Sequence, residues 1–515
     1  MMAVLVVSTS QAQEGMSSII GMLSRSITLR LENRLPEALA CLDTILAQAP
    51  TFAPCLLDRA KVLALLQRFE DALADCRAYF RHGPAAPELL RLRDDIRDAA
   101  LTHYQQTLAL APDDVGALYR RANIHLQCEN YALAADEYRL VLSIEPQHEG
   151  SLSNLGYAMV ALERHEEALA AYDQLLALRP DDAVNCVNRG NVLKNLHRVS
   201  EAAFAYQQAI LLEHDFAEAH LELAHCRLLA GRYSEGWRLF EQRWSTAQLA
   251  RHYLPSSQPA WLGETPLAGR TILLWAEQGL GDTVQFCRCV PAVMALAGQV
   301  ILRVPAPLCR LMQSLAPGLT VIDEQQALPP HDCHTPLMSL PLALGWSAPP
   351  PSGPYLAVPT ANAAANPRRR VGLAWAGRQY GLRNTTRDMP LAALLPLAGL
   401  DIDVISLQKD MPLADTATLR GWPRLQPAGA LPDMLATAEL ISQLDLVISV
   451  DTAIAHVAAA LGKPCWLLLR HASEWRWQLE RNDTPWYPTL RIFRQHRAGD
   501  WDTVVDEVRA ALVGR

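Results

Sequence analysis

A regular spacing of prolines limits the fold of the first half of this chain more than any other feature. Pro50 and Pro84 lie 34 residues apart, and so do Pro112, Pro146 and Pro180. Small, aromatic and glycine residues repeat with the same spacing: Ala38, Ala72, Ala100, Ala134, Ala168 and Ala202; Tyr104, Tyr138, Tyr172, Tyr206 and Phe240; Gly156 and Gly190. A period of this length, shared by four kinds of position, predicts an array of stacked helical units.

The repeat has a physical explanation. Small residues let the two helices of a unit approach closely, an aromatic residue is expected to fill the gap to the next unit, and proline ends the second helix. A single helix pair cannot bury its own apolar face, so neighbouring pairs stack into a solenoid. The pattern resembles the tetratricopeptide repeat (TPR), with about seven units from Ser17 to Ser245 and a degenerate one near 85–112. The tryptophan-rich last unit, Gly231–Trp244, is expected to pack against the next domain.

The second half of the chain alternates short apolar runs with amphipathic ones after a proline-rich break at Leu254–Pro259. Such alternation predicts parallel sheets, and a proline- and alanine-rich stretch from Ala348 to Pro367 indicates two of them facing each other across a cleft. The strands are expected at Thr271–Trp275, Gln299–Val304, Leu319–Asp323, Arg370–Ala374, Asp403–Leu407, Leu444–Val450 and Pro464–Leu469.

The expected organisation has six parts. They are an N-terminal segment at 1–16, a TPR solenoid at 17–248, a linker at 249–268, a first Rossmann-like half on the acceptor side at 269–347, a second linker at 348–367, and a second Rossmann-like half on the nucleotide-sugar side at 368–515. The predicted fold is therefore an α solenoid followed by an α/β region.

One segment of the second half, LDLVISVDTAIAHVAAALGKPCWLLL, is the most informative. A buried strand is expected to end at Val450, and Thr452 is well placed to cap the helix that follows Asp451. His456 lies about one turn into that helix. The free amides and positive dipole of a helix N-terminus attract a diphosphate, so the segment predicts a nucleotide site.

The same segment is similar to the heptosyltransferase family, which carries Asp-Thr/Ser-Gly/Ala-x-x-His on a helix followed by Ala-Leu-Gly-x-Pro. The N-terminal half of that family is matched by the Gly-Asp of the loop GLGD (Gly279–Asp282) and by the expected helix after it, which runs on to Pro291-Ala292. Together with the repeats, the chain looks like a bacterial TPR-bearing glycosyltransferase with the GT-B fold of two Rossmann-like domains. Its layout is also similar to that of O-GlcNAc transferases and of flagellin glycosyltransferases.

This resemblance implies an enzyme that moves a sugar from a nucleotide-sugar to a protein Ser or Thr, with flagellin as one candidate acceptor. Two alternatives stay open. The acceptor could be a glycan or lipopolysaccharide, or the protein could be a non-catalytic TPR scaffold with a nucleotide-binding relic. The sequence names neither the sugar, the nucleotide, the acceptor protein nor the stereochemical outcome.

On the acceptor side, the resemblance implies that Asp282 is the general base, and the alternative is an ordinary helix cap. Gly279 and Gly281 are expected to form a tight turn that presents this carboxylate. On the donor side, Asp451, Thr452 and His456 are expected to form the nucleotide site, and the alternative for His456 is a core histidine.

Further donor contacts are expected from Arg383 and Arg387, where the family often has lysine, because a guanidinium suits a phosphate. Gln408 and Lys409 end a strand, where ligands of parallel sheets bind. Asn154 and Asn188 lie 34 residues apart and could bind a peptide backbone, as in the asparagine ladder of O-GlcNAc transferases. The alternative for both is a solvated polar face. The tail cluster Glu474–Pro488 is expected mainly to pack across the cleft.

Other expectations are negative. No metal and no cofactor are expected, because Asp401–Asp403 and Asp500–Asp502 lack the setting of a metal-dependent transferase and the nucleotide-sugar is a substrate. A net charge of −8 argues against nucleic acid as a partner. Eleven scattered cysteines and the absence of a long apolar run indicate a cytoplasmic protein with no membrane span. The repeats could also mediate oligomerisation.

Overall fold

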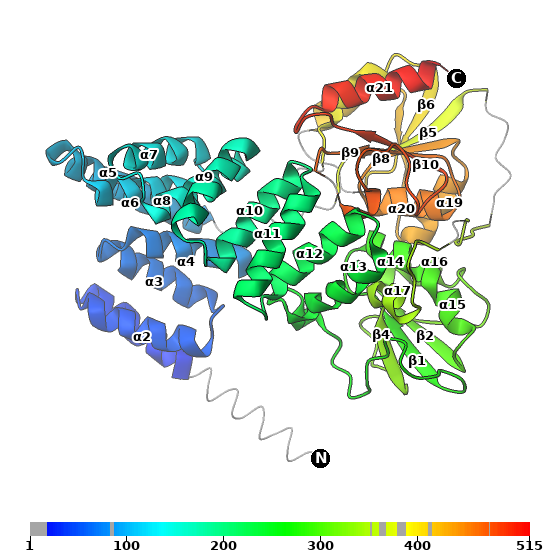
Figure 1. Cartoon of the computed structure of the whole chain (residues 1–515), viewed down its shortest axis with the longest axis horizontal. Helices are drawn as coiled ribbons and strands as arrows, with labels where there is room; N and C mark the ends of the chain where they lie inside the picture. The colour runs from blue at the N-terminus through cyan, green and yellow to red at the C-terminus, as the bar shows by residue number, and fades with distance from the viewer. Residues whose placement is uncertain are drawn as a thin grey trace. The chain divides into compact units, whose positions relative to one another are not determined.

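The computed structural model describes residues 18–82, 87–350, 353–359, 367–377, 388–409, 415–472 and 474–514. The chain divides into two compact units, Met1–Asn185 and Cys186–Arg515. The first unit begins with a helix at 18–31 and continues as antiparallel helix pairs (Figure 1). Its further helices are α2 (Leu35–Gln48), α3 (Ala53–Leu65), α4 (Phe69–His82), α5 (Pro87–Leu110), α6 (Val115–Gln127), α7 (Tyr131–Ile144), α8 (Glu149–Ala161) and α9 (His165–Leu178).

Packing within the repeats explains most of the sequence columns. The repeated alanines, among them Ala38, Ala134 and Ala168, are fully buried. A Cβ on Gly156 would lie 2.6 Å from Cζ of Tyr172, a residue of the same repeat. The aromatic column therefore packs against the glycine of its own helix pair, and it also contacts the next unit, since Tyr138 clusters with Leu155 of α8.

The turn inside each helix pair uses a left-handed residue. Positive φ angles occur at 34-residue intervals at Asn33 and Gln67, and again at Glu129, Glu163, His197 and Gly231. Only the last of these is glycine, so the residue types at these positions do not predict the left-handed turn.

The second unit starts with the last helices of the solenoid. The unit boundary at Asn185 lies inside α10 (Ala183–Asn195), which is followed by α11 (Val199–Leu212), α12 (Ala217–Leu229) and α13 (Tyr233–Phe240), then the 3₁₀ helices η1 (Glu241–Ser245) and η2 (Ala250–His252). Trp237 of α13 is 2% exposed and packs edge-to-face on Phe286, Trp475 and Trp486, with ring centroids 5.4–6.4 Å apart. The predicted packing of the last repeat against the next domain is confirmed.

A four-stranded parallel sheet, sheet A, follows. Its strands are β1 (Thr271–Trp275), β2 (Gln299–Val304), β3 (Thr320–Asp323) and β4 (Cys333–Pro336), in the order β3-β2-β1-β4. Its helical segments are α14 (Leu280–Phe286), η3 (Cys287–Cys289), α15 (Val290–Met294), η4 (Ala306–Leu308), α16 (Cys309–Met312), η5 (Leu337–Ser339) and α17 (Leu340–Ala343). The three predicted strands are present, and β4 was missed.

A six-stranded parallel sheet, sheet B, has the order β10-β9-β8-β5-β6-β7. The strand order reverses between β5 and β8, which makes their carboxyl ends the switch point where doubly wound sheets bind ligands. The strands are β5 (Arg369–Ala374), β6 (Ile402–Ser406), β7 (Leu425–Pro427), β8 (Leu446–Val450), β9 (Cys465–Leu469) and β10 (Leu490–Arg494). The helical segments are η6 (Leu391–Leu397), α18 (Thr416–Arg420), α19 (Met434–Ser442), α20 (Ala453–Ala460), η8 (Trp475–Trp477) and α21 (Trp501–Val513).

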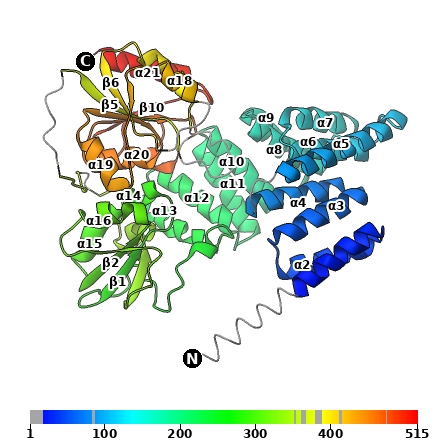
Figure 2. The ribbon, with the colours of Figure 1, turned by 180° about the vertical axis from the view of Figure 1, so that it is seen from behind.

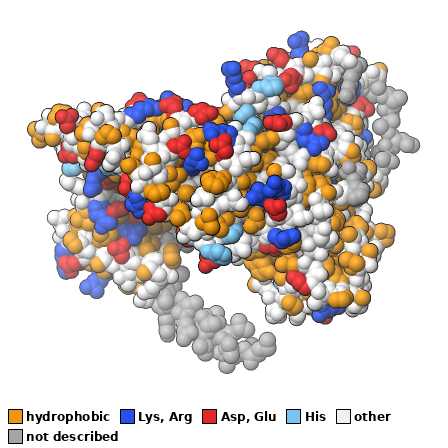
Figure 3. Space-filling view, viewed as in Figure 1, with side chains coloured by type: hydrophobic (Ala, Val, Ile, Leu, Met, Phe, Trp, Pro, Cys, Tyr) orange, Lys and Arg blue, Asp and Glu red, His pale blue; other side chains and the backbone are white. Residues whose placement is uncertain are grey.

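Figures 1 and 2 show α14 and α16 facing α19 and α20 between the two sheets, with α21 on the far side of sheet B. On the face drawn in Figure 3, acidic and basic side chains are interspersed with hydrophobic ones. All eleven cysteines are free thiols and none is exposed. Among the helices in the described part of the chain, none has the length and apolar character of a membrane span.

Candidate functional site

The first turns of α14 and α20 meet between the sheets. A Cβ on Gly281 would lie 2.9 Å from Cδ2 of His456 and 3.6 Å from Cα of Ala453, so only glycine permits this approach. Gly279 has φ of −69°, and neither Gly279 nor Gly281 has a positive φ. Gly279 is the N-cap of α14 and Gly281 lies within its first turn, and the predicted role of these glycines in presenting Asp282 stays a prediction.

Asp282 is held from both halves of the site. Its Oδ2 accepts a hydrogen bond from the Gly279 amide at 3.0 Å, which is a cap of the helix that carries it. Its Oδ1 accepts from Nη2 of Arg476 at 2.7 Å, and the carboxylate is 17% exposed. The capping alternative thus describes one of its contacts, and the role of Asp282 as a base stays a prediction.

Asp451 and Thr452 lie at the start of α20. Oδ2 of Asp451 accepts a hydrogen bond from Nε1 of Trp477 at 2.8 Å. Thr452 occupies the N-cap position as expected, but its hydroxyl lies 3.0 Å from that of Ser449 and makes no capping hydrogen bond. The N-terminus of α20 consequently has no side-chain cap.

His456 is 1% exposed and is enclosed by aromatic rings. A hydrogen bond of 2.8 Å joins its Nδ1 to the hydroxyl of Tyr487, and the ring of Trp477 lies 5.3 Å away. Burial, together with the charges of Arg476 and Arg288, lowers the pKa of His456 well below 6.5. In this structure His456 is a buried histidine whose Nε2 lies 3.9 Å from Oδ1 of Asp451, and its contact with a donor stays a prediction.

The segment η8 connects the two carboxylates, which the sequence did not reveal. Arg476 binds Asp282 and the neighbouring Trp477 binds Asp451, while Trp475 packs on Trp237. The tryptophans of this segment do pack across the cleft as predicted. The sequence feature that could have indicated a polar role for this segment is Arg476, the single arginine between Trp475 and Trp477.

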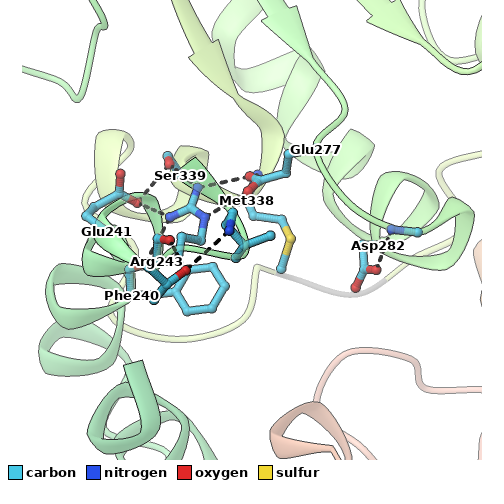
Figure 4. A network of polar contacts seen from close by, with 10 residues as sticks. Phe240, Glu241, Arg243, Glu277, Asp282, Met338 and Ser339 are labelled. Carbon is cyan, nitrogen blue, oxygen red and sulfur yellow. Dashed lines mark hydrogen bonds and ion pairs between the residues drawn. The ribbon is translucent and has the colours of Figure 1, made fainter. Parts of the chain in front are cut away.

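At the carboxyl edge of sheet A, a buried ion pair fills the space beside β1 (Figure 4). Arg243 from η1 donates to both carboxylate oxygens of Glu277, at 2.7 and 2.9 Å, and its side chain is 0% exposed. The same guanidinium donates to Ser339 at 2.7 Å and to Glu241 at 2.8 Å. Asp282 lies apart from this network in Figure 4. Neither partner of the ion pair was singled out from the sequence.

The other donor-side predictions have different outcomes. Arg383 and Arg387 lie outside the described residues. Gln408 accepts from the amides of Trp375 and Ala376 at 3.3 and 3.1 Å and donates to the Ala376 carbonyl at 2.9 Å, so its side chain holds the loop after β5. Lys409 is exposed beyond the carboxyl end of β6.

The two predicted peptide-binding asparagines belong to different compact units. Asn154 donates to Oδ1 of Asn123 at 3.0 Å and to the hydroxyl of Tyr119 at 3.3 Å, so part of its amide is used within the repeats. Asn188 is partly buried on α10. A ladder that joins them stays a prediction.

Within the described residues, no group of three or more His, Cys, Asp and Glu side chains is placed to hold a metal ion. The expectation that the reaction needs no metal ion stays a prediction.

Comparisons with known proteins match both halves of the chain. Residues 428–504 match the family "Glycosyltransferase family 9 (heptosyltransferase)", and residues 84–151 and 150–182 match tetratricopeptide repeats. Protein FlbA of Caulobacter vibrioides is 25% identical over 334 residues, which are 58% of this chain and 55% of FlbA. The chain thus spans about half the length of this relative.

Two solved structures are similar to the repeats. MamA matches 33% of this chain over 99% of its own length, with 16% identity and a TM-score of 0.30. YrrB, described as a TPR protein with an unusual peptide-binding site, matches 41% over 96% of its length, with 17% identity and a TM-score of 0.28. The range 428–504 contains α19, β8, α20, β9 and η8. This chain therefore carries tetratricopeptide repeats followed by a C-terminal glycosyltransferase family 9 domain.

Proposed function

We propose that this protein transfers a sugar from a nucleotide-sugar to a Ser or Thr hydroxyl of a protein acceptor bound by the TPR arm. The observation that carries the proposal is the meeting of α14 and α20 between two parallel sheets. One helix carries a carboxylate, and the other has an N-terminus without a side-chain cap. Two facing sheets of this kind fit a GT-B arrangement.

The donor diphosphate is proposed to bind at the N-terminus of α20. This helix follows β8, and the switch point of sheet B lies between β8 and β5. Unused amides and the helix dipole stabilise an anion there without a metal ion. Arg383 and Arg387 follow β5 in the sequence and would supply the positive charge.

The acceptor hydroxyl is proposed to lose its proton to Asp282. Its oxygen then forms the bond to the anomeric carbon, while the bond from that carbon to the diphosphate breaks and the electron pair leaves with the nucleoside diphosphate. Each carboxylate oxygen has two lone pairs, so the hydrogen bonds from Gly279 and Arg476 leave acceptor capacity on Asp282.

A protein acceptor is favoured by the repeats, because TPR arrays commonly bind other polypeptides. The last repeat also packs directly on the catalytic region through Trp237. The resemblance to flagellin glycosyltransferases makes flagellin the first acceptor to test.

The experiment has two stages on the full chain. Thermal-shift screening with UDP-, GDP-, ADP- and CMP-sugars identifies the donor, and intact-mass spectrometry of flagellin incubated with that donor detects the transferred sugar. We expect one nucleotide to raise the melting temperature and one sugar mass to be added to Ser or Thr. Stabilisation by none of the donors would overturn the proposal, and transfer only to a glycan would overturn its protein acceptor.

A second candidate function is a non-catalytic module that binds a nucleotide or a partner. Two observations favour it. Asp282 and Asp451 both accept hydrogen bonds from η8, and the side chain of His456 is buried. Nucleotide binding without donor hydrolysis or transfer to any acceptor would support this module.

A further inference from the structure

We infer that a cavity between the last helical repeat and both sheets binds the acceptor segment, and that it selects a polypeptide with cationic side chains beside the acceptor hydroxyl. This inference rests on the proposed function and specifies its acceptor. The cavity has a volume of about 590 Å³, within the range of about 300–1,000 Å³ typical of ligand sites. Three parts of the second unit line it together: the end of the helical repeats, the carboxyl edge of sheet A, and η8.

Each part contributes a different wall. Helix α12 provides Glu218, Glu222 and His225, and the segment after α13 provides Leu249. The carboxyl edge of sheet A provides Glu277, Gln278 and Met338, and η8 with its preceding residue provides Glu474, Trp475 and Arg476. The lining combines apolar side chains such as Leu249 with polar and charged ones, as a peptide with both kinds of side chain requires.

The charges of the cavity do not cancel. Glu277 is neutralised by Arg243, and Glu222 forms an ion pair with Lys194 and lies 3.5 Å from Nδ1 of His225. Glu218 and Glu474 are both exposed and form no ion pair within the described part of the chain; Arg476 acts on Glu474 through its charge but is itself paired with Asp282. These two carboxylates give the cavity a residual negative charge, which favours a cationic ligand.

Arg476 provides the independent sign that a ligand belongs here. The residue is 8% exposed and lines the cavity, yet its Nε has no hydrogen-bond partner. A buried guanidinium N–H without an acceptor is unfavourable; this Nε is closed to solvent, so a peptide carbonyl would satisfy it only after a small shift of the side chain. Nη2 of the same side chain holds Asp282 at 2.7 Å. A segment bound to Nε would therefore place its hydroxyl next to the proposed base.

The test is a binding assay that needs neither donor nor turnover. Short fluorescent peptides differ only in the residues that flank one serine, which are lysine, alanine or glutamate, and their anisotropy is measured with the full chain. We expect the lysine peptide to bind about fivefold more tightly than the alanine peptide, and the glutamate peptide more weakly than both. A photo-crosslinking residue at Leu249 should label the lysine peptide.

Matched variants locate the effect. Glu218→Gln with Glu474→Gln should remove the preference for lysine and leave the affinity for the alanine peptide unchanged. Glu213→Gln, an exposed carboxylate outside the cavity, should retain the preference. Equal binding of all three peptides, or a preference that survives the double substitution, would overturn the inference.

Failure of the proposed function would give a different result. In that case no nucleotide-sugar would support transfer, while the charge preference and the crosslink at Leu249 would persist. Efficient transfer to lysine- and glutamate-flanked serines alike would instead overturn only the acceptor specificity.

Discussion

Sheets A and B share the order of their first four strands, but their carboxyl edges are used in different ways. In sheet A the order is β3-β2-β1-β4, and in sheet B the equivalent strands run β7-β6-β5-β8. The edge of sheet A carries the buried pair of Arg243 and Glu277 beside the cavity that Glu277 and Met338 line, and Asp282 caps α14. The N-terminus of α20 at the edge of sheet B has no side-chain cap. This difference is the reason why we propose that the anionic donor binds at sheet B.

The comparison also shows that topology alone does not locate a ligand. A switch point is a crevice in either sheet, but in sheet A a guanidinium from the end of the solenoid occupies part of it. This arginine joins the end of the helical repeats to sheet A through Glu277 and Ser339.

The largest expected effect comes from Asp282→Asn. Asparagine can still accept the hydrogen bond from Gly279 but cannot take a proton, so transfer should fall by about 10²–10⁴-fold with donor affinity retained. Initial rates and calorimetric donor titration measure the two quantities. Asp483→Asn, which breaks an exposed pair with Arg481, is the matched control and should change neither. Transfer by Asp282→Asn at the wild-type rate would remove the difference we assign to the two edges.

The buried ion pair at the carboxyl edge of sheet A can be removed with Arg243→Met. Glu277, whose side chain is 1% exposed, would be left without its cation, and the free energy of unfolding should fall by about 3–5 kcal/mol. Urea unfolding followed by tryptophan fluorescence measures the loss. Adding Glu277→Gln should recover most of it, whereas Arg481→Met at an exposed pair should cost less than about 1 kcal/mol. A small effect of Arg243→Met would mean that the pair does not hold the repeat in place.

The junction of the two edges can be tested with Gly281→Ala. The added Cβ would lie 2.9 Å from Cδ2 of His456, so α14 and α20 must move apart. A displacement of about 1 Å at a catalytic centre can lower the rate by about 10²-fold, and we expect a loss of transfer on this scale. Gly399→Ala, where a Cβ meets nothing within 4 Å, is the control and should behave as wild type in the same rate assay. An active Gly281→Ala protein would argue against the close approach.

The smallest expected effect is a change in the pH dependence of stability. The pKa of His456 is well below 6.5 in the folded protein, and an unfolded histidine titrates near that value. Its contribution is therefore complete above about pH 6.5 and is lost as the pH falls, by up to about 1.4 kcal/mol per pH unit. In urea unfolding between pH 7.5 and 5.5, His456→Gln should flatten this slope, and His214→Gln at an exposed site should not. An unchanged slope in His456→Gln would contradict the buried, neutral state.

The sequence predicted the solenoid and most of the strands because both depend on repeated or local patterns, but β7 and β10 were missed as well as β4. Apolar runs such as Thr271–Trp275 are visible within a few residues, and the 34-residue period is visible when neighbouring repeats are compared. Strand β4 was missed because Cys333-His-Thr-Pro336 is not an apolar run, although all four residues are buried.

The site was predicted only where it coincides with a motif. Asp282 and Asp451 could be named from their motifs, but Arg476 lies 194 residues from the first of them, and no local pattern encodes that ion pair. The burial of His456 depends on Gly281 and Tyr487, which come from distant segments. The role of Arg243 depends on the docking of the last repeat onto sheet A.

Hydrogen–deuterium exchange with and without the stabilising nucleoside diphosphate tests the central claim most directly, because it asks which edge binds the donor. We predict protection of the backbone amides at residues 449–456, where β8 enters α20, and no change at residues 277–283, where β1 enters α14. Protection confined to 277–283 would place the donor on sheet A and contradict the account.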